Sequence, residues 1–233
     1  MPEYRDTIQL LSLMYNHLNA DEAEKLFQDF HAHLASWRDN GVPFDIRDFF
    51  RTRMETLFEN KFEANSSSFL LRETTLNDFG YVLPALNFPT QIGRFGPVLE
   101  VGAGRGFLSA VLSHAGVDVI ATDPKPWPGA KHVQPMDGSQ SIKEHCDRAV
   151  LCAWPGYQQP WLNTVALSIP RGQYLLIVGE DAGGCTGHDT LWDVLEDHFY
   201  EVTTPEDTQA VISWPNIHDR LRVWQRVTER KTS

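Results

Sequence analysis

The sequence predicts an α/β fold with a mostly parallel sheet, preceded by a helical N-terminal extension. Apolar residues recur at helical spacing through residues 1–95, whereas short apolar runs alternate with helix-period segments from Pro97 onward. Strands that alternate with helices are typical of a parallel sheet covered on both faces. We therefore expect two parts, a helical extension or lid over residues 1–79 and an α/β domain over residues 80–233.

Three helices are expected in the extension. The apolar faces of the first two consist of Ile8, Leu11, Tyr15 and Leu18, and of Ala23, Leu26, Phe27, Phe30 and Leu34. Asp21 is a candidate N-cap for the second helix, with Glu24 completing a capping box. The third helix is expected over residues 43–60, and the serine-rich run 65–68 marks a break.

The α/β part divides into short segments. The expected strands are 98–101, 117–121, 131–135, 149–153 and 173–179, and the expected helices are 107–114, 160–167 and 188–199. The tail alternates over residues 210–214 and 220–226, which predicts a terminal hairpin at the sheet edge.

Composition limits the possible partners. The formal net charge is −11, so the chain repels polyphosphate backbones and long nucleic acids are not expected as substrates. The longest apolar runs, such as 174–178, are too short to cross a bilayer. Cys146, Cys152 and Cys185 lack metal-ligand spacing, which favours reduced thiols. We expect a cytoplasmic protein with a small-molecule substrate, no metal and no membrane partner; the oligomeric state is left open.

The segment 100–106, Glu-Val-Gly-Ala-Gly-Arg-Gly, lies between a predicted strand and a predicted helix. Glycines there allow a tight turn and close approach of a ligand to the backbone, although such a turn also occurs for structural reasons alone. The next strand ends near Asp123, where a carboxylate can accept hydrogen bonds from ribose hydroxyls. Dinucleotide-binding loops separate their last two glycines by two residues, whereas one residue separates Gly104 from Gly106. Glu100 suits a ligand with an ammonium group and no phosphate. The glycine spacing disfavours a nicotinamide cofactor.

This loop resembles motif I of class I S-adenosylmethionine (SAM)-dependent methyltransferases, which have a Rossmann-like fold with a mostly parallel seven-stranded sheet. Residues 80–227 are similar to a group of small bacterial methyltransferase-like proteins at the loop and at 152–157, 180–187 and 214–221. The resemblance implies SAM as the cofactor. The residues expected to bind it are Glu100, Gly102, Ala103, Gly104, Gly106, Asp123, Pro124, Asp137, Gly138, Cys152 and Trp154. Asp137 would hold the adenine amino group, or it is a turn aspartate with no ligand.

The segment 152–157 falls at motif IV and resembles the aromatic-proline turn of amino-methylating enzymes. Trp154 replaces the usual Asp or Asn, and Gly156 stands where a second proline is common, so a DNA-adenine activity is not expected. Trp154 and Tyr157 can face a sulfonium by cation–π contact, or both pack at the sheet edge. The expected catalytic residues are Tyr157, Glu180 and His218: Glu180 is a base or a helix cap, and His218 is a candidate general base in a turn.

The leading hypothesis is methyl transfer from SAM to the nitrogen or oxygen of a small molecule. The alternative is a SAM cyclase, in which the amine of SAM attacks its own Cγ and gives azetidine-2-carboxylate and methylthioadenosine. A second alternative is a non-catalytic SAM-binding protein.

Overall fold

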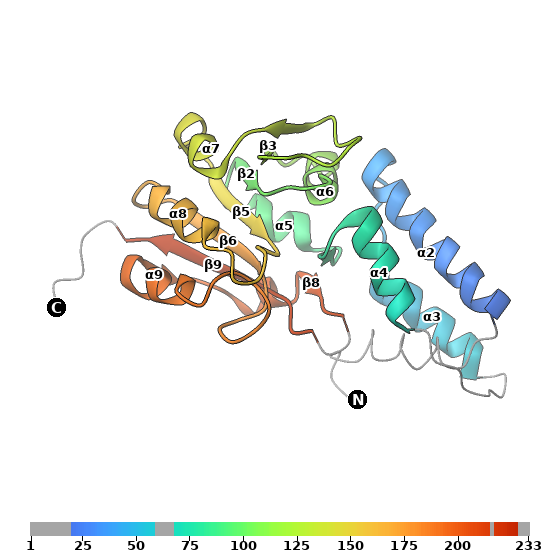
Figure 1. Ribbon diagram of the computed structural model, residues 1–233. Coiled ribbons are helices and arrows are strands. Elements are labelled where there is room, and N and C mark those ends of the chain that lie inside the picture. The colour runs from blue at the N-terminus through green and yellow to red at the C-terminus, as the bar shows by residue number, and fades with distance from the viewer. Residues whose placement is uncertain (1–19, 59–67, 215–216, 228–233) are drawn as a thin grey trace.

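The computed structural model describes residues 20–58, 68–214 and 217–227, and its centre is a seven-stranded sheet (Figure 1). The strands are β2 (Val98–Val101), β3 (Val119–Asp123), β4 (Val133–Pro135), β5 (Ala149–Ala153), β6 (Tyr174–Gly179), β7 (Phe199–Glu201) and β9 (Arg220–Arg226). Their order is β4-β3-β2-β5-β6-β9-β7, and β9 runs antiparallel to both of its neighbours. The predicted fold, an α/β fold with a mostly parallel seven-stranded sheet, is confirmed.

The strand order reverses at β2. This strand pairs in parallel with β3 on one side and with β5 on the other, and all four of its residues are buried. Open α/β sheets bind ligands outside the carboxyl ends of the strands at such a reversal. The sheet therefore places the glycine-rich segment and the segment after β5 at one edge, side by side.

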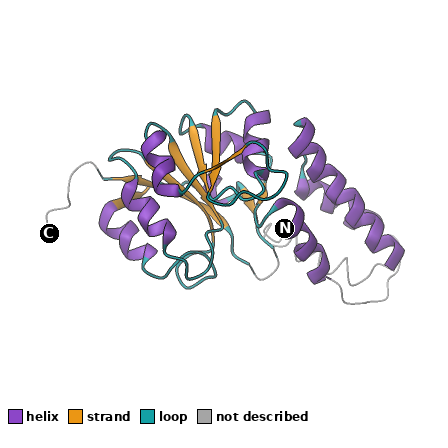
Figure 2. Cartoon of the chain, turned by 45° about the horizontal axis from the view of Figure 1, so that its top comes forward, coloured by secondary structure: helices purple, strands orange, loops and turns teal. Residues whose placement is uncertain are grey.

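Helices cover both faces of the sheet (Figure 2). The helices α5 (Phe88–Gly93) and α6 (Phe107–His114) belong to one apolar cluster, and α7 (Gly138–Glu144), α8 (Trp161–Ser168) and α9 (Leu191–His198) belong to another. A short helix, α10 (Pro205–Thr208), begins with a capping box between Thr204 and Asp207. No helix in the described part of the chain is long and apolar enough to span a bilayer.

The helical extension consists of α2 (Ala20–Asn40), α3 (Ile46–Phe58) and α4 (Ser68–Phe79), which lie on the right of Figure 1. Helix α2 packs on α6 and α4. Phe30, Leu34 and Phe50 are fully buried in the same cluster as Phe107 and Val111 of α6. The extension thus shares one core with the α/β part, and the division at residues 79 and 80 stays a prediction.

Two predicted boundaries in the extension are wrong. Asp21 lies inside the first described turn of α2, so it is not the N-cap of that helix. Helix α3 begins at Ile46 and not at Pro43, because Asp45 caps it: the Oδ1 atom of Asp45 accepts a hydrogen bond from the amide of Asp48 at 2.9 Å. The predicted first helix, residues 8–18, lies outside the described residues.

The predicted terminal hairpin is also wrong. The first half of the tail forms β8 (Val211–Ile212), which pairs with β1 (Leu83–Pro84) in a separate two-stranded sheet. The second half, β9, pairs with β6 and β7. Both tail segments are strands as expected, but an alternating pattern does not specify which strand will be the partner.

The other differences between the predicted and the observed element bounds have local causes. The strand predicted at 117–121 begins at Val119, because the amide of Val117 donates to Leu112 O at 3.0 Å and closes α6 behind Gly116. The strand predicted from residue 131 begins at Val133 after a turn, and the helix predicted from residue 188 begins at Leu191. No bounds were predicted for strands β1 and β7 or for helices α4, α5, α7 and α10.

Candidate functional site

The glycine-rich loop leaves the carboxyl end of β2 in a left-handed backbone conformation. The φ angles are +76° at Gly102, +53° at Gly104 and +72° at Gly106, a region that residues with a Cβ rarely adopt. The amides of Gly102 and Ala103 donate to Thr122 O at 2.8 and 3.0 Å, which fixes the loop against β3. The backbone of this loop is therefore both rigid and open to close approach.

Asp123 ends β3 beside this loop, as the sequence predicts for a ribose-binding acid. Its Oδ2 atom accepts a hydrogen bond from the amide of Gly104 at 3.0 Å, and its Oδ1 atom accepts one from the amide of Lys125 at 2.8 Å. Each carboxylate oxygen has a second lone pair, so both can still accept a ligand hydroxyl. The neighbouring Pro124 is exposed.

Glu100 lies in β2 beneath the loop with 2% of its surface exposed. Burial raises the pKa of Glu100 to about 8, against the opposing effect of hydrogen bonds from Ser109. Its Oε2 atom has no hydrogen-bond partner among the described residues. Cys152 is buried close by, and burial together with the charge of Glu100 raises the pKa of its thiol. A buried carboxyl group with one unpaired oxygen favours a cationic partner.

Two of the predicted binding glycines have a packing reason to be glycine. A Cβ on Gly106 would overlap the side chain of His132 and lie 2.8 Å from Val133 Cγ2. A Cβ on Gly138 would lie 2.5 Å from Val165 Cγ2 and 2.9 Å from Val101 Cγ1. Their role in cofactor binding stays a prediction, because helix packing alone accounts for both glycines.

Asp137 caps α7. Its Oδ1 atom accepts hydrogen bonds from the amides of Ser139 and Gln140 at 3.0 and 3.1 Å. This is the turn role that the sequence left open, and the adenine contact stays a prediction.

Two tryptophans that sequence reasoning missed lie against the glycine loop. Trp161, the first residue of α8, lies 3.2 Å from the position of a Cβ on Gly102. Trp127 lies 3.5 Å from the corresponding position on Gly104, and its amide donates to Gly104 O at 3.2 Å. Nothing in the sequence indicated these contacts, because both tryptophans are far from the loop along the chain and only the fold brings them to it.

Trp154 follows β5 at the same edge of the sheet. Its φ angle is +51°, an uncommon conformation for a bulky residue, and such strained residues often cluster at functional sites. The indole Nε1 atom donates to Asp219 Oδ1 at 2.7 Å, and the indole ring stacks on Tyr81 with centroids 4.7 Å apart and planes 12° apart. Several contacts thus hold Trp154 in a strained but defined position.

Asp219, which precedes β9, is 4% exposed, and its Oδ2 atom has no partner in the described part of the chain. Burial raises the pKa of Asp219 to about 7, and the nearby charge of Glu180 adds to the rise, while Trp154 and Arg72 oppose it. Sequence reasoning missed Asp219, Arg72 and Tyr81. The one available signal for Asp219 was its place beside His218, at a turn between two strand-like runs.

Glu180 holds two loops together. Its Oε2 atom accepts a hydrogen bond from the amide of Cys185 at 2.8 Å, and its Oε1 atom accepts one from the amide of His218 at 3.1 Å. The side chain of His218 is exposed, and Tyr157 is 60% exposed. The structure brings Glu180 to Asp219 and Trp154, whereas the catalytic roles predicted for His218 and Tyr157 stay predictions.

Known proteins were compared with the whole chain. No family model and no curated protein sequence matches it. Solved structures do match. The Burkholderia thailandensis 1,6-didemethyltoxoflavin-N1-methyltransferase, described with bound S-adenosylhomocysteine, is 17% identical, with a TM-score of 0.40 over 60% of this chain and 76% of its own. A SAM-dependent methyltransferase from Archaeoglobus fulgidus is 14% identical, with a TM-score of 0.40 over 74% and 99%. The N-methyltransferase NodS from Bradyrhizobium japonicum WM9 is 14% identical, with a TM-score of 0.35 over 60% and 94%.

All three are methyltransferases, which is the class that the sequence resembles. At these identities and TM-scores, the function of this chain is argued from its own residues.

Proposed function

We propose that the chain binds SAM at the carboxyl edge of the sheet and transfers its methyl group to a nitrogen or oxygen of a small molecule. One observation carries this proposal: the glycine loop with Asp123 and the unpaired oxygen of Asp219 lie along the same edge. The loop follows β2, and Asp219 precedes Arg220, which pairs with Gly179 at the carboxyl end of β6. A donor site and a proton acceptor thus face one region of the molecule.

The donor site fits SAM in three respects. The left-handed glycines remove the side chains that would hold a ligand away from the backbone. Asp123 offers two oxygens to the ribose hydroxyls. Glu100 has an unpaired, buried oxygen that an ammonium group would satisfy. SAM supplies a methyl group on a positively charged sulfur.

On the acceptor side, Trp154 and Tyr81 form an aromatic pair, and such surfaces attract cations. Asp219 would take the proton that the acceptor atom loses, because its pKa of about 7 is close to working pH and its Oδ2 atom is unpaired. Glu180 is a positioning residue, since it is buried and its two oxygens join the backbone amides of Cys185 and His218. The chain would accelerate the reaction mainly by orienting the acceptor and excluding water.

The described residues contain no group of three or more metal-ligating side chains. The acidic net charge of −11 supports a small-molecule acceptor over a long nucleic acid.

The first test is incubation of the purified protein with SAM alone, followed by mass spectrometry. We expect SAM to remain intact without an acceptor, and S-adenosylhomocysteine to form when amines, phenols and carboxylic acids are screened. Asp219→Asn should lower the rate on an active acceptor by about 100-fold or more with little change in SAM affinity. Enzyme-dependent methylthioadenosine together with azetidine-2-carboxylate would contradict the proposal and identify a SAM cyclase.

A further inference from the structure

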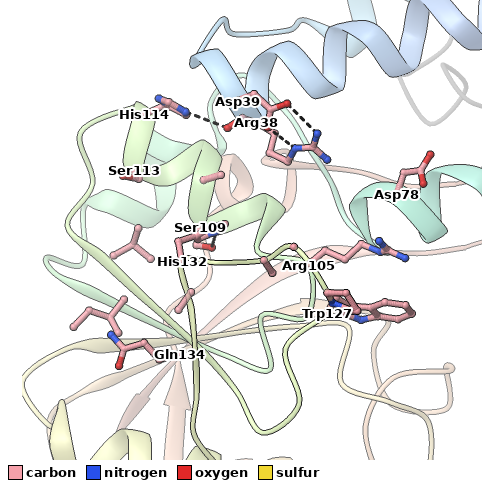
Figure 3. Close-up of a pocket in the computed structure, with 17 residues that line it drawn as sticks. Arg38, Asp39, Asp78, Arg105, Ser109, Ser113, His114, Trp127, His132 and Gln134 are labelled. Atoms are coloured by element: carbon pink, nitrogen blue, oxygen red, sulfur yellow. Dashed lines mark hydrogen bonds and ion pairs between the residues drawn. The ribbon is translucent and has the colours of Figure 1, made fainter.

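A cavity of about 680 Å³ lies beside the sheet, next to the glycine loop, whose Arg105 lines it (Figure 3). Its walls come from α6, β3 and the segment between β3 and β4, and the C-terminal end of α2 covers it. None of Gly102, Gly104, Asp123 or Trp154 lines it. Its volume is within the range of small-molecule sites.

The cavity has a cause in the topology. Parallel strands are usually joined by a crossover that contains a helix, and this helix covers the sheet beside its neighbour. Residues 124–132, which join β3 to β4 and are all described, form turns and no helix. The face of β3 next to α6 therefore lacks the helix that would normally fill this space.

The floor and walls combine apolar and polar groups. Val119, Ala121 and Ala110 supply apolar surface, and the side chains of Ser109, Ser113 and Gln134 add hydroxyl and amide groups. A ligand with an apolar body and a polar head matches this lining.

Most of the charged groups on the walls are paired. Arg38 makes two hydrogen bonds with Asp39, at 2.7 and 2.9 Å, and Asp78 lies 3.3 Å from His31. Arg105 is different: its guanidinium lies 4.1 Å from the centroid of the Trp127 ring, and no described carboxylate is within ion-pairing distance of it. Arg105 is thus a cation on the cavity wall that no described carboxylate pairs, in a chain with a net charge of −11.

We propose that this cavity is a second ligand site, which binds a small organic acid with its carboxylate on Arg105 and its apolar body along β3. A guanidinium that is stacked on an aromatic ring still presents its N–H groups at its edge, where a carboxylate accepts two parallel hydrogen bonds. The stack on Trp127 orients Arg105 and lowers the entropy lost on binding.

The site also contacts the back of the glycine loop. Trp127 donates its amide to Gly104 O at 3.2 Å, and the Nε2 atom of His132 lies 2.9 Å from Gly106 O. An acid bound to Arg105 therefore lies next to the glycine loop, in a cavity that neither Glu100 nor Asp123 lines.

The test titrates the full chain, without SAM, with acetate, phenylacetate and indole-3-acetate, and with phenylacetamide as the neutral counterpart of phenylacetate. The readout is the NMR signal of the Trp127 indole N–H, assigned with Trp127→Phe. We expect saturable shifts with at least one aromatic acid below about 10 mM. Phenylacetamide should bind at least about 10-fold more weakly, because it lacks the charge-assisted pair with Arg105.

Three variants locate the binding. Arg105→Gln should weaken the acid by about 10-fold or more, and Ser113→Trp, which fills the cavity from α6, should abolish binding. Lys143→Gln, which removes one positive charge from the exposed face of α7, is the matched control and should change nothing. The proposal is overturned if no acid gives saturable shifts, if Arg105→Gln or Ser113→Trp binds like the wild type, or if SAM displaces the acid competitively.

Discussion

Glu100 and Asp219 are two buried carboxyl groups of the candidate site. Each has one oxygen without a partner among the described residues, and burial raises the pKa of each, to about 8 and about 7. An acid with a raised pKa keeps its proton in the folded state under conditions where the unfolded chain has lost it. Its contribution to stability is therefore fully present at low pH and is lost as the pH rises through the folded pKa.

This gives a pH prediction for Glu100. The free energy of unfolding should fall as the pH rises from 4.5 to about 8, with a slope from this group on the order of 1 kcal/mol per pH unit. Glu100→Gln should remove that slope, because the amide does not titrate. Urea denaturation across this range measures it, and Asp197→Asn on the exposed side of α9 is the control. A slope that is the same in wild type and Glu100→Gln would contradict the account.

At the scale of residues, the sequence predicted where the loop glycines and Asp123 lie, while their role in binding stays a prediction. The glycines and Asp123 were predictable because their spacing along the chain reflects one local turn and one adjacent strand. Tyr81, Trp127 and Asp219 were not, because they come from distant segments that only the tertiary fold brings to the site.

At the scale of elements, the loop joins β2 to α6, and Gly106 is the N-cap of that helix in a left-handed conformation. A Cβ there would also overlap His132, so this glycine is required for packing whatever the loop binds. Loss of SAM binding in a Gly106 variant would therefore not by itself show ligand contact.

Gly106→Ala should destabilise the protein more than Gly129→Ala does. Both positions have a positive φ, which costs about 1–2 kcal/mol for a residue with a Cβ, but a Cβ at Gly129 meets no atom within 4 Å. The extra loss at Gly106 comes from displacing His132 and Val133. Urea denaturation of both variants measures the difference, and equal losses would show that the loop relaxes freely.

Element bounds were predicted best where hydrophobic periodicity and glycine turn signals agree. Strand β2 and helix α6 have the predicted bounds, because an apolar run, glycines and a helical period follow one another there. The tail was predicted as strands but with the wrong partners, since β8 pairs with β1, a strand of two residues inside a region of helical pattern. Pairing between distant segments leaves no trace in local alternation.

At the scale of the whole molecule, the extension and the sheet share one apolar cluster, which places α2 over α6 and encloses the cavity beside β3. The N-terminal helix α2 thus covers the space that the absent crossover helix between β3 and β4 leaves open. The sequence predicted a helical extension before an α/β part but not this packing, because helical periodicity shows which face is apolar and not what it packs against.

Calorimetric titration with SAM tests the central claim most directly. Wild-type protein should bind SAM, Asp123→Ala should bind it about 10- to 100-fold more weakly through lost ribose hydrogen bonds, and Gly104→Val should not bind it. All variants should keep the circular dichroism spectrum of the wild type, and Asp197→Ala should bind like the wild type. Unchanged affinity in both site variants, or tight binding of a nicotinamide dinucleotide without affinity for SAM, would contradict the proposed site.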